Sequence, residues 1–179
     1  MGKACHPHAG TGTDNGMKIV SRHDIEAPPD FVFQALTDFD SWERSAMRRG
    51  AEVTRTDKLT VPGAGLSWLV RFRFRAKDRK LTVRLTGIDA PSRLSFALKG
   101  TLFDATCSVD LMELGAMRTR MIAVSEAVPN TLAARLILQS LRLARARVQR
   151  RVDARIGAVA QEIEERYRLQ TRPRRMGLG

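Results

Sequence analysis

The segment LSWLVRFRFRA at residues 66–76 is the most regularly patterned part of the chain. Large apolar residues alternate with mostly basic ones, and this period of two predicts a half-buried antiparallel strand. Because a one-residue slip would bury guanidinium groups, we expect the two phenylalanines, Phe72 and Phe74, to face a long C-terminal helix. The arginines of the segment are expected to face solvent: Arg71, Arg73 and Arg75.

Similar but weaker patterns predict further strands on both sides of this segment, separated by turn signals such as KDRK at 77–80. The first predicted strand is followed by two short helices, which begin at Pro29 and end before Gly50. The short connections favour one antiparallel sheet. The other expected strands lie at 17–27, 51–58, 81–89, 93–100, 101–114 and 117–128.

A helical pattern extends from Thr131 to about Arg168, with Asn130 as a candidate N-cap. A straight helix of this span would measure about 57 Å, whereas a compact domain of this size has a radius of gyration of about 16 Å. The helix must therefore overhang the domain or break near Gly157. One helix covers only part of a wide sheet, so a sheet that curls around the helix would leave part of its apolar inner face uncovered. Such a concave apolar space is typical of small-molecule binding sites.

Length and composition favour one domain at 17–168, between tails at 1–16 and 169–179. Cys5 and Cys107 are too few and too far apart for a disulfide scaffold, so a reducing compartment and a cytoplasmic location are expected. There is no run of 18 apolar residues that would span a membrane.

The formal net charge of +12 is the unusual feature of the composition. It predicts attraction to polyanions, although a solvated arginine-rich surface is the simpler interpretation. Peripheral contact with an anionic membrane is the sharper hypothesis. Nucleic acid is less expected as a partner, because the basic segments lack the interleaved aromatic residues that stack on bases.

The stretch IEAPPDFVFQALTDFDSWE at 25–43 resembles the SRPBCC superfamily, which has the START and birch-allergen helix-grip fold. The features similar to its polyketide cyclase/dehydrase branch are Ala27-Pro28, Val32-Phe33, Asp38 and Trp42. This resemblance implies an α+β fold in which a curved antiparallel sheet of about seven strands surrounds a long C-terminal helix. It also implies a cavity, which in this superfamily holds lipids, polyketides, sterols or plant hormones.

The candidate cavity wall consists of apolar residues that the patterns place inward on the strands and helices, although plain core packing is the alternative for each. These residues are Val32, Leu36, Trp42, Trp68, Val70, Phe72, Phe74, Val83, Leu85, Phe96, Leu98, Leu141, Val148 and Val152.

Groups with catalytic potential are scarce, and we assign no catalytic residue, metal ion or cofactor. His23 is more typical of a strand surface than of a catalytic base, and the spacing of Cys5, His6 and His8 matches no strong zinc signature. No Ser-His-Asp pattern or pair of carboxylates is evident.

The favoured hypothesis is a protein that binds or transports a hydrophobic small molecule, such as a lipid, a quinone or a polyketide-like compound, in an apolar cavity between the sheet and the C-terminal helix. One alternative is a cyclase or dehydratase of aromatic polyketide type, which requires polar groups that converge inside the cavity. Another is a basic interaction module. The early part of the long helix has extra apolar residues that favour either dimerisation or gating of the cavity: Leu132, Leu136, Ile137 and Leu143.

Overall fold

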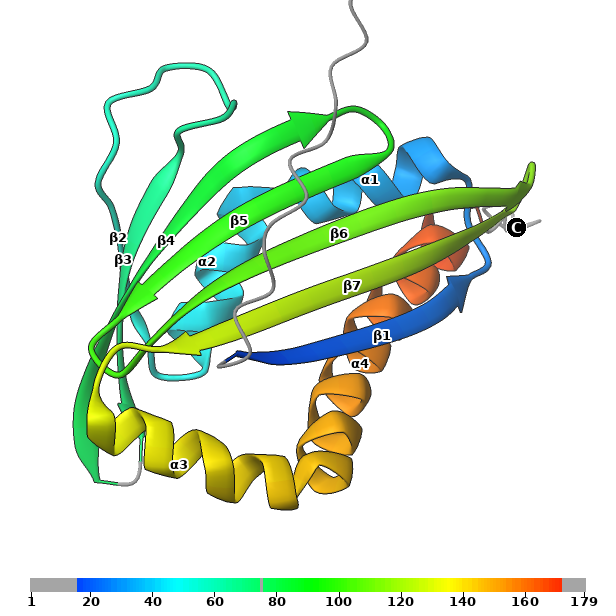
Figure 1. Cartoon of the computed structure of the whole chain (residues 1–179). Helices are drawn as coiled ribbons and strands as arrows, with labels where there is room; N and C mark the ends of the chain where they lie inside the picture. The colour runs from blue at the N-terminus through cyan, green and yellow to red at the C-terminus, as the bar shows by residue number, and fades with distance from the viewer. Residues whose placement is uncertain (1–15, 75, 172–179) are drawn as a thin grey trace, which may run out of the picture.

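The structure is a computed structural model that describes residues 16–74 and 76–171, except for the side chain of Phe74. Within those residues, seven strands form one curved antiparallel sheet in the order β1-β7-β6-β5-β4-β3-β2 (Figure 1). The strands are β1 (Met17–Ile25), β2 (Glu52–Arg55), β3 (Ser67–Phe74), β4 (Lys77–Asp89), β5 (Arg93–Gly100), β6 (Phe103–Gly115) and β7 (Arg118–Pro129).

Two short helices, α1 (Pro29–Thr37) and α2 (Phe39–Arg48), follow β1, as the sequence predicts. Pro29 occupies the first turn of α1, where a missing N–H has no consequence. The Asp38 side chain accepts a hydrogen bond from Ser41 N at 3.2 Å and so caps α2. The two helices lie on the same face of the sheet as the last helix (Figure 1).

The C-terminal helical region is divided into α3 (Leu132–Leu143) and α4 (Arg145–Thr171). The predicted break near Gly157 is therefore wrong, because the chain bends at Ala144. The bend lets α3 extend from the end of β7 while α4 packs along β1 (Figure 1). Gly157 lies inside α4, which ends three residues beyond the expected Arg168.

The proposed N-cap is also wrong by one residue. The hydroxyl of Thr131 accepts a hydrogen bond from Ala134 N at 3.1 Å, and this contact caps α3. The amide of Asn130 instead donates to Gly100 O at 3.0 Å and to Asp104 Oδ1 at 2.9 Å. Asn130 thus ties the end of β7 to the connection between β5 and β6.

The charged segment KDRK at 77–80 is not a turn but the first part of β4. The turn lies immediately before it, where Ala76 adopts a positive φ of 62°. Pairing continues through Phe72↔Arg79 and Arg73↔Asp78. The apolar pattern does not reveal this extension, because the added residues are mostly exposed and are held by backbone pairing.

The alternation of exposure along β3 is as predicted for the side chains that the structure describes, whereas the orientation of Phe72 toward the long helix stays a prediction. Arg71 and Arg73 are exposed and Phe72 is half-buried. Arg71 Nη1 also lies 3.7 Å from Glu52 Oε2 on the neighbouring strand. The predictions for Phe74 and Arg75 fall outside the described side chains.

The core has two parts, one on each side of α1. The first joins β1, α1 and α4 through buried residues that include Ile25, Val32, Ala160 and Ile163. The second lies between α2 and the middle of the sheet, where Phe33, Leu66, Trp68, Leu85 and Leu94 are buried together. The candidate site lies in this second part, because most of its lining residues belong to it or pack against it.

Candidate functional site

An apolar pocket of about 290 Å³ lies between the sheet and the helices. The sheet supplies one wall through residues on five adjacent strands, β2 to β6. Trp68 and Val83 are directly paired on β3 and β4, which places their side chains next to each other on the same face. The wall consists of Val53, Trp68, Val70, Val83, Leu94, Phe96 and Val109.

The opposite wall is formed mainly by α2. Its pocket residues, at positions 39, 42, 43 and 46, follow the helical spacing of three and four, so they share one face. Phe39 contacts the Trp68 ring with a centroid separation of 5.3 Å. Leu36 at the end of α1 and Val159 on α4 complete the lining. The pocket therefore lies mainly between the sheet and α2, and not between the sheet and the C-terminal helix as the sequence predicts.

Two interactions fix α2 in this position. Trp42 Nε1 donates to Ala35 O at 3.2 Å, which anchors the indole to the end of α1. Arg166 Nη2 on α4 donates to Asp38 Oδ2 at 2.8 Å, and this bond lowers the pKa of Asp38. The ion pair therefore joins the start of α2 to the long helix.

Glu43 is the only ionisable residue among the described residues that line this pocket. Its Oε1 accepts a hydrogen bond of 2.6 Å from Trp68 Nε1. The indole N–H thus has a partner, and the carboxylate is held in a fixed orientation at an apolar surface. The second carboxylate oxygen remains an acceptor that a bound molecule can use.

The structure brings several of the predicted wall residues together and places others elsewhere. Val32 and Leu85 are buried in the core and do not line the pocket. Phe72, Leu98, Leu141, Val148 and Val152 are half-buried and also lie outside its lining. The predicted residues that do line it are Leu36, Trp42, Trp68, Val70, Val83 and Phe96.

Of the pocket residues that α2 supplies, only Trp42 was predicted from the sequence. Phe39, Glu43 and Ala46 are at helical spacing from Trp42, and this periodicity was the available signal. Leu94, Val109 and Val159 are apolar and could be placed on inner faces, but no sequence pattern separates residues lining a pocket from those filling a core. Val53 belongs to a strand too short for a reliable pattern.

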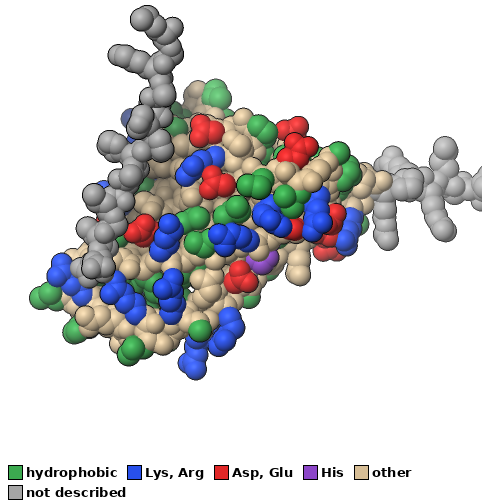
Figure 2. Space-filling view, turned by 45° about the vertical axis from the view of Figure 1, so that its right-hand side comes forward, with side chains coloured by type: hydrophobic (Ala, Val, Ile, Leu, Met, Phe, Trp, Pro, Cys, Tyr) green, Lys and Arg blue, Asp and Glu red, His purple; other side chains and the backbone are tan. Residues whose placement is uncertain are grey.

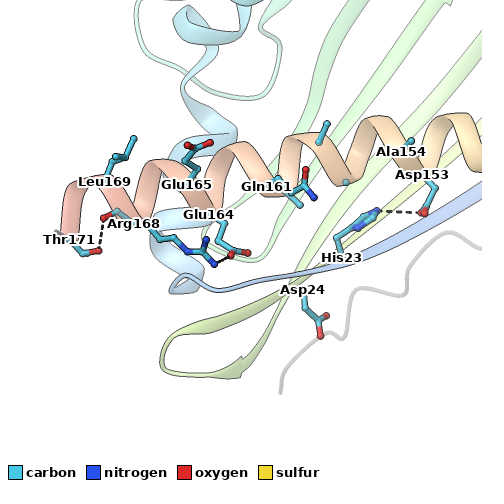
Figure 3. Close-up of a pocket in the computed structure, with 13 residues that line it drawn as sticks. His23, Asp24, Asp153, Ala154, Gln161, Glu164, Glu165, Arg168, Leu169 and Thr171 are labelled. Atoms are coloured by element: carbon cyan, nitrogen blue, oxygen red, sulfur yellow. Dashed lines mark hydrogen bonds and ion pairs between the residues drawn. The ribbon is translucent and has the colours of Figure 1, made fainter.

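A second, polar hollow lies between β1 and α4 (Figure 3). Three polar side chains come together there: Ser21, His23 and Asp153. His23 Nε2 lies 3.0 Å from Ser21 Oγ and 3.3 Å from Asp153 Oδ1. The hydroxyl of Ser21 also donates a hydrogen bond to Asp153. A catalytic triad needs the base to contact the nucleophile and the carboxylate through different ring nitrogens. Here both partners use the same nitrogen and Ser21 is buried, so the cluster joins β1 to α4 and is not a catalytic triad.

Other predicted or potential groups add no chemistry to the pocket. The Cys107 thiol is half-buried, and burial raises its pKa, so it is not an activated nucleophile. Cys5, His6 and His8 lie outside the described residues. Within the described part of the chain, no group of histidine, cysteine and acidic residues is arranged to hold a metal ion. No helix in that part is long and apolar enough to span a membrane.

A sheet that curves around a C-terminal helix, with an apolar pocket between its inner face and the helices, defines the helix-grip class of domains. Residues 17–164 match the family model described as "Polyketide cyclase / dehydrase and lipid transport". The chain belongs to this family, and hence to the SRPBCC superfamily.

Similar solved structures agree with this fold. The aromatase/cyclase Zhui from Streptomyces sp. R1128 has 16% identity and a TM-score of 0.67, over 87% of this chain and 98% of that one. Norcoclaurine synthase from Thalictrum flavum has 12% identity and a TM-score of 0.62, over 85% and 96% of the two chains. TTHA0849 from Thermus thermophilus has 14% identity and a TM-score of 0.59, over 82% and 97%. A comparison with curated protein sequences finds no match.

Proposed function

We propose that the protein binds a hydrophobic small molecule, such as a lipid, a quinone or a polyketide-like compound, in the pocket between the sheet and α2. The observation that carries this proposal is an apolar space of about 290 Å³ in which Glu43 is the single ionisable residue among the described residues of the lining. Binding sites for small molecules typically combine a mostly apolar lining with a few polar groups. The family, whose description includes lipid transport, supports the same class of function.

The volume of the pocket limits what it can enclose. A cavity of about 150 Å³ holds a benzene molecule, so a pocket of about 290 Å³ suits two or three fused rings or a short acyl segment. A long-chain lipid would have to extend out of the pocket. We therefore favour a compact aromatic ring system or a short isoprenoid segment as the part of the molecule that is bound.

Glu43 gives this proposal a chemical preference. A carboxylate at an apolar wall is stabilised by hydrogen-bond donors, and one of its oxygens already accepts from Trp68. A phenol, alcohol or amine on the bound molecule would supply the second donor. A purely hydrocarbon ligand would leave the second oxygen without a partner and should bind less tightly.

Native mass spectrometry tests the proposal. The native mass of protein purified without organic solvent is compared with the mass of the denatured chain, and a chloroform–methanol extract of the same preparation is analysed for hydrophobic compounds. We expect an adduct that is lost on denaturation and is reduced in Val83→Trp, which fills the pocket. A native mass equal to that of the chain alone, with no binding of an added naphthol to the folded protein, would contradict the proposal.

A second candidate function is a cyclase or dehydratase of aromatic polyketide type. Glu43 favours it, because an oriented carboxylate in an apolar pocket is a suitable general acid or base. Incubation of the protein with linear polyketide substrates provides the discriminating test. If a cyclised product forms when linear polyketide substrates are added, and Glu43→Gln abolishes its formation, the protein is an enzyme; unchanged substrate favours binding alone.

A further inference from the structure

The outer face of α3 carries a row of exposed leucines. Leu132, Leu136 and Leu143 are separated by four and seven residues, so they lie along one side of the helix. Their side chains are 76%, 66% and 93% exposed. The inward side of the same helix buries Ala134 and Leu138. An isolated exposed leucine needs no explanation, but an aligned row on a helix that is already packed on its other side indicates a contact surface.

The segment that carries this leucine row has charges of one sign. Between Glu126 and Asp153 the sequence contains six arginines and no acidic residue. At the corner between α3 and α4, an open hollow of about 420 Å³ is lined by Leu143 together with Arg147 and Arg150. Figure 2 shows hydrophobic and basic side chains side by side along the lower edge of the molecule, where Figure 1 places α3.

We propose that the outer face of α3 docks on an anionic membrane, with Leu132, Leu136 and Leu143 inserted among the lipids. Helices that lie on membranes combine an apolar face with flanking basic residues, and anionic head groups attract each nearby cation. A second copy of the chain is a poorer occupant of this face, because a symmetric pairing would bring two sets of arginines together. The proposal is independent of the ligand, because none of the three leucines lines the apolar pocket.

Vesicle flotation tests the proposal with a Leu132→Gln/Leu136→Gln/Leu143→Gln variant. The protein is mixed with phosphatidylcholine vesicles that do or do not contain phosphatidylserine. We expect the unmodified protein to float only with the anionic vesicles, and to float less as salt is added. The triple variant should bind at least about tenfold more weakly, because three apolar side chains no longer enter the membrane.

A matched control replaces three exposed apolar residues elsewhere, as Val61→Gln/Met112→Gln/Leu169→Gln, and should float like the unmodified protein. Arg147→Gln/Arg150→Gln should weaken binding to anionic vesicles and flatten its salt dependence. Circular dichroism verifies that each variant is folded.

Failure of the unmodified protein to bind anionic vesicles at low salt would overturn the proposal, as would undiminished binding by the leucine variant. A dimer in analytical ultracentrifugation that the leucine variant abolishes would instead assign the face to a second copy.

Discussion

Trp68 Nε1 donates a hydrogen bond of 2.6 Å to Glu43 Oε1 and so connects β3 with α2 across one side of the apolar pocket. The bond gives the buried indole N–H a partner and orients the one ionisable group of the described lining. Stability and the proposed ligand recognition therefore depend on the same pair of residues.

Replacing Glu43 tests this coupling. Glu43→Leu removes the acceptor of the Trp68 N–H and should lower the free energy of unfolding by about 1–3 kcal/mol. Glu43→Gln keeps a carbonyl acceptor and should cost less than about 1 kcal/mol. Urea unfolding followed by tryptophan fluorescence measures both. Equal losses in the two variants would show that the hydrogen bond does not stabilise the fold.

Gly157 allows α4 to approach β1 closely. A Cβ at this position would lie 2.9 Å from His23 Cε1, and the His23 ring is held by Ser21 and Asp153. Gly157→Ala should therefore lower the free energy of unfolding by about 1–3 kcal/mol, although alanine favours the helix.

In a His23→Ala background, the same Gly157→Ala substitution should stabilise the protein by about 0.5–1 kcal/mol, because only the helix propensity remains. Thermal or urea unfolding of the four proteins in this cycle provides the measurement. A loss of stability in both backgrounds would exclude the His23 ring as the cause.

Asp57 organises the connection between β2 and β3. It pairs with Arg55 at 3.0 Å and accepts hydrogen bonds of 2.9 Å from both Ser67 N and Leu59 N. The bonds from Arg55 and Ser67 hold the pKa of Asp57 well below its usual value. The unfolded chain therefore takes up this proton at a higher pH than the folded protein does.

The stabilisation that Asp57 contributes is thus fully present at pH values above the ordinary carboxyl pKa. It is lost as the pH falls toward the lower pKa that Asp57 has in the folded protein. Asp57→Asn should flatten the dependence of the unfolding free energy on pH between about pH 4 and pH 2. Asp30→Asn, on the exposed side of α1, is the control. Urea titrations at a series of pH values give the slopes, and an unchanged slope in Asp57→Asn would contradict the prediction.

Cys107 should be unreactive in the folded protein, because burial raises the pKa of its thiol. In a Cys5→Ser background, an aromatic disulfide reagent at about pH 8 should react at least about tenfold more slowly with the folded protein than with the urea-unfolded chain. Stopped-flow absorbance measures both rates. Equal rates would show that the thiol is accessible in solution.

The periodicity of the sequence was sufficient to predict the sheet. The alternation in β3 depends on local residue order and on the cost of burying arginine, and the structure agrees for Arg71, Phe72 and Arg73. The family resemblance at 25–43 added the helix-grip topology, which periodicity alone does not determine.

The features that sequence did not predict depend on contacts between distant residues. The bend at Ala144 has no glycine or proline to mark it, and it follows from α3 and α4 packing against different parts of the sheet. Likewise, the sequence alone indicates an ordinary surface residue at Glu43, because only the folded chain places this side chain beside Trp68. Leu98 and Val83 show the same inward pattern, yet only Val83 lines the pocket.

The most direct test of the central claim is to compare Val83→Trp with Thr82→Trp in a titration with a naphthol. Val83 lines the pocket, whereas Thr82 is the adjacent exposed residue on the same strand. Val83→Trp should abolish saturable binding while the protein remains folded, and Thr82→Trp should bind like the unmodified protein. Saturable binding of unchanged affinity in Val83→Trp would contradict the assignment of this pocket as the ligand site.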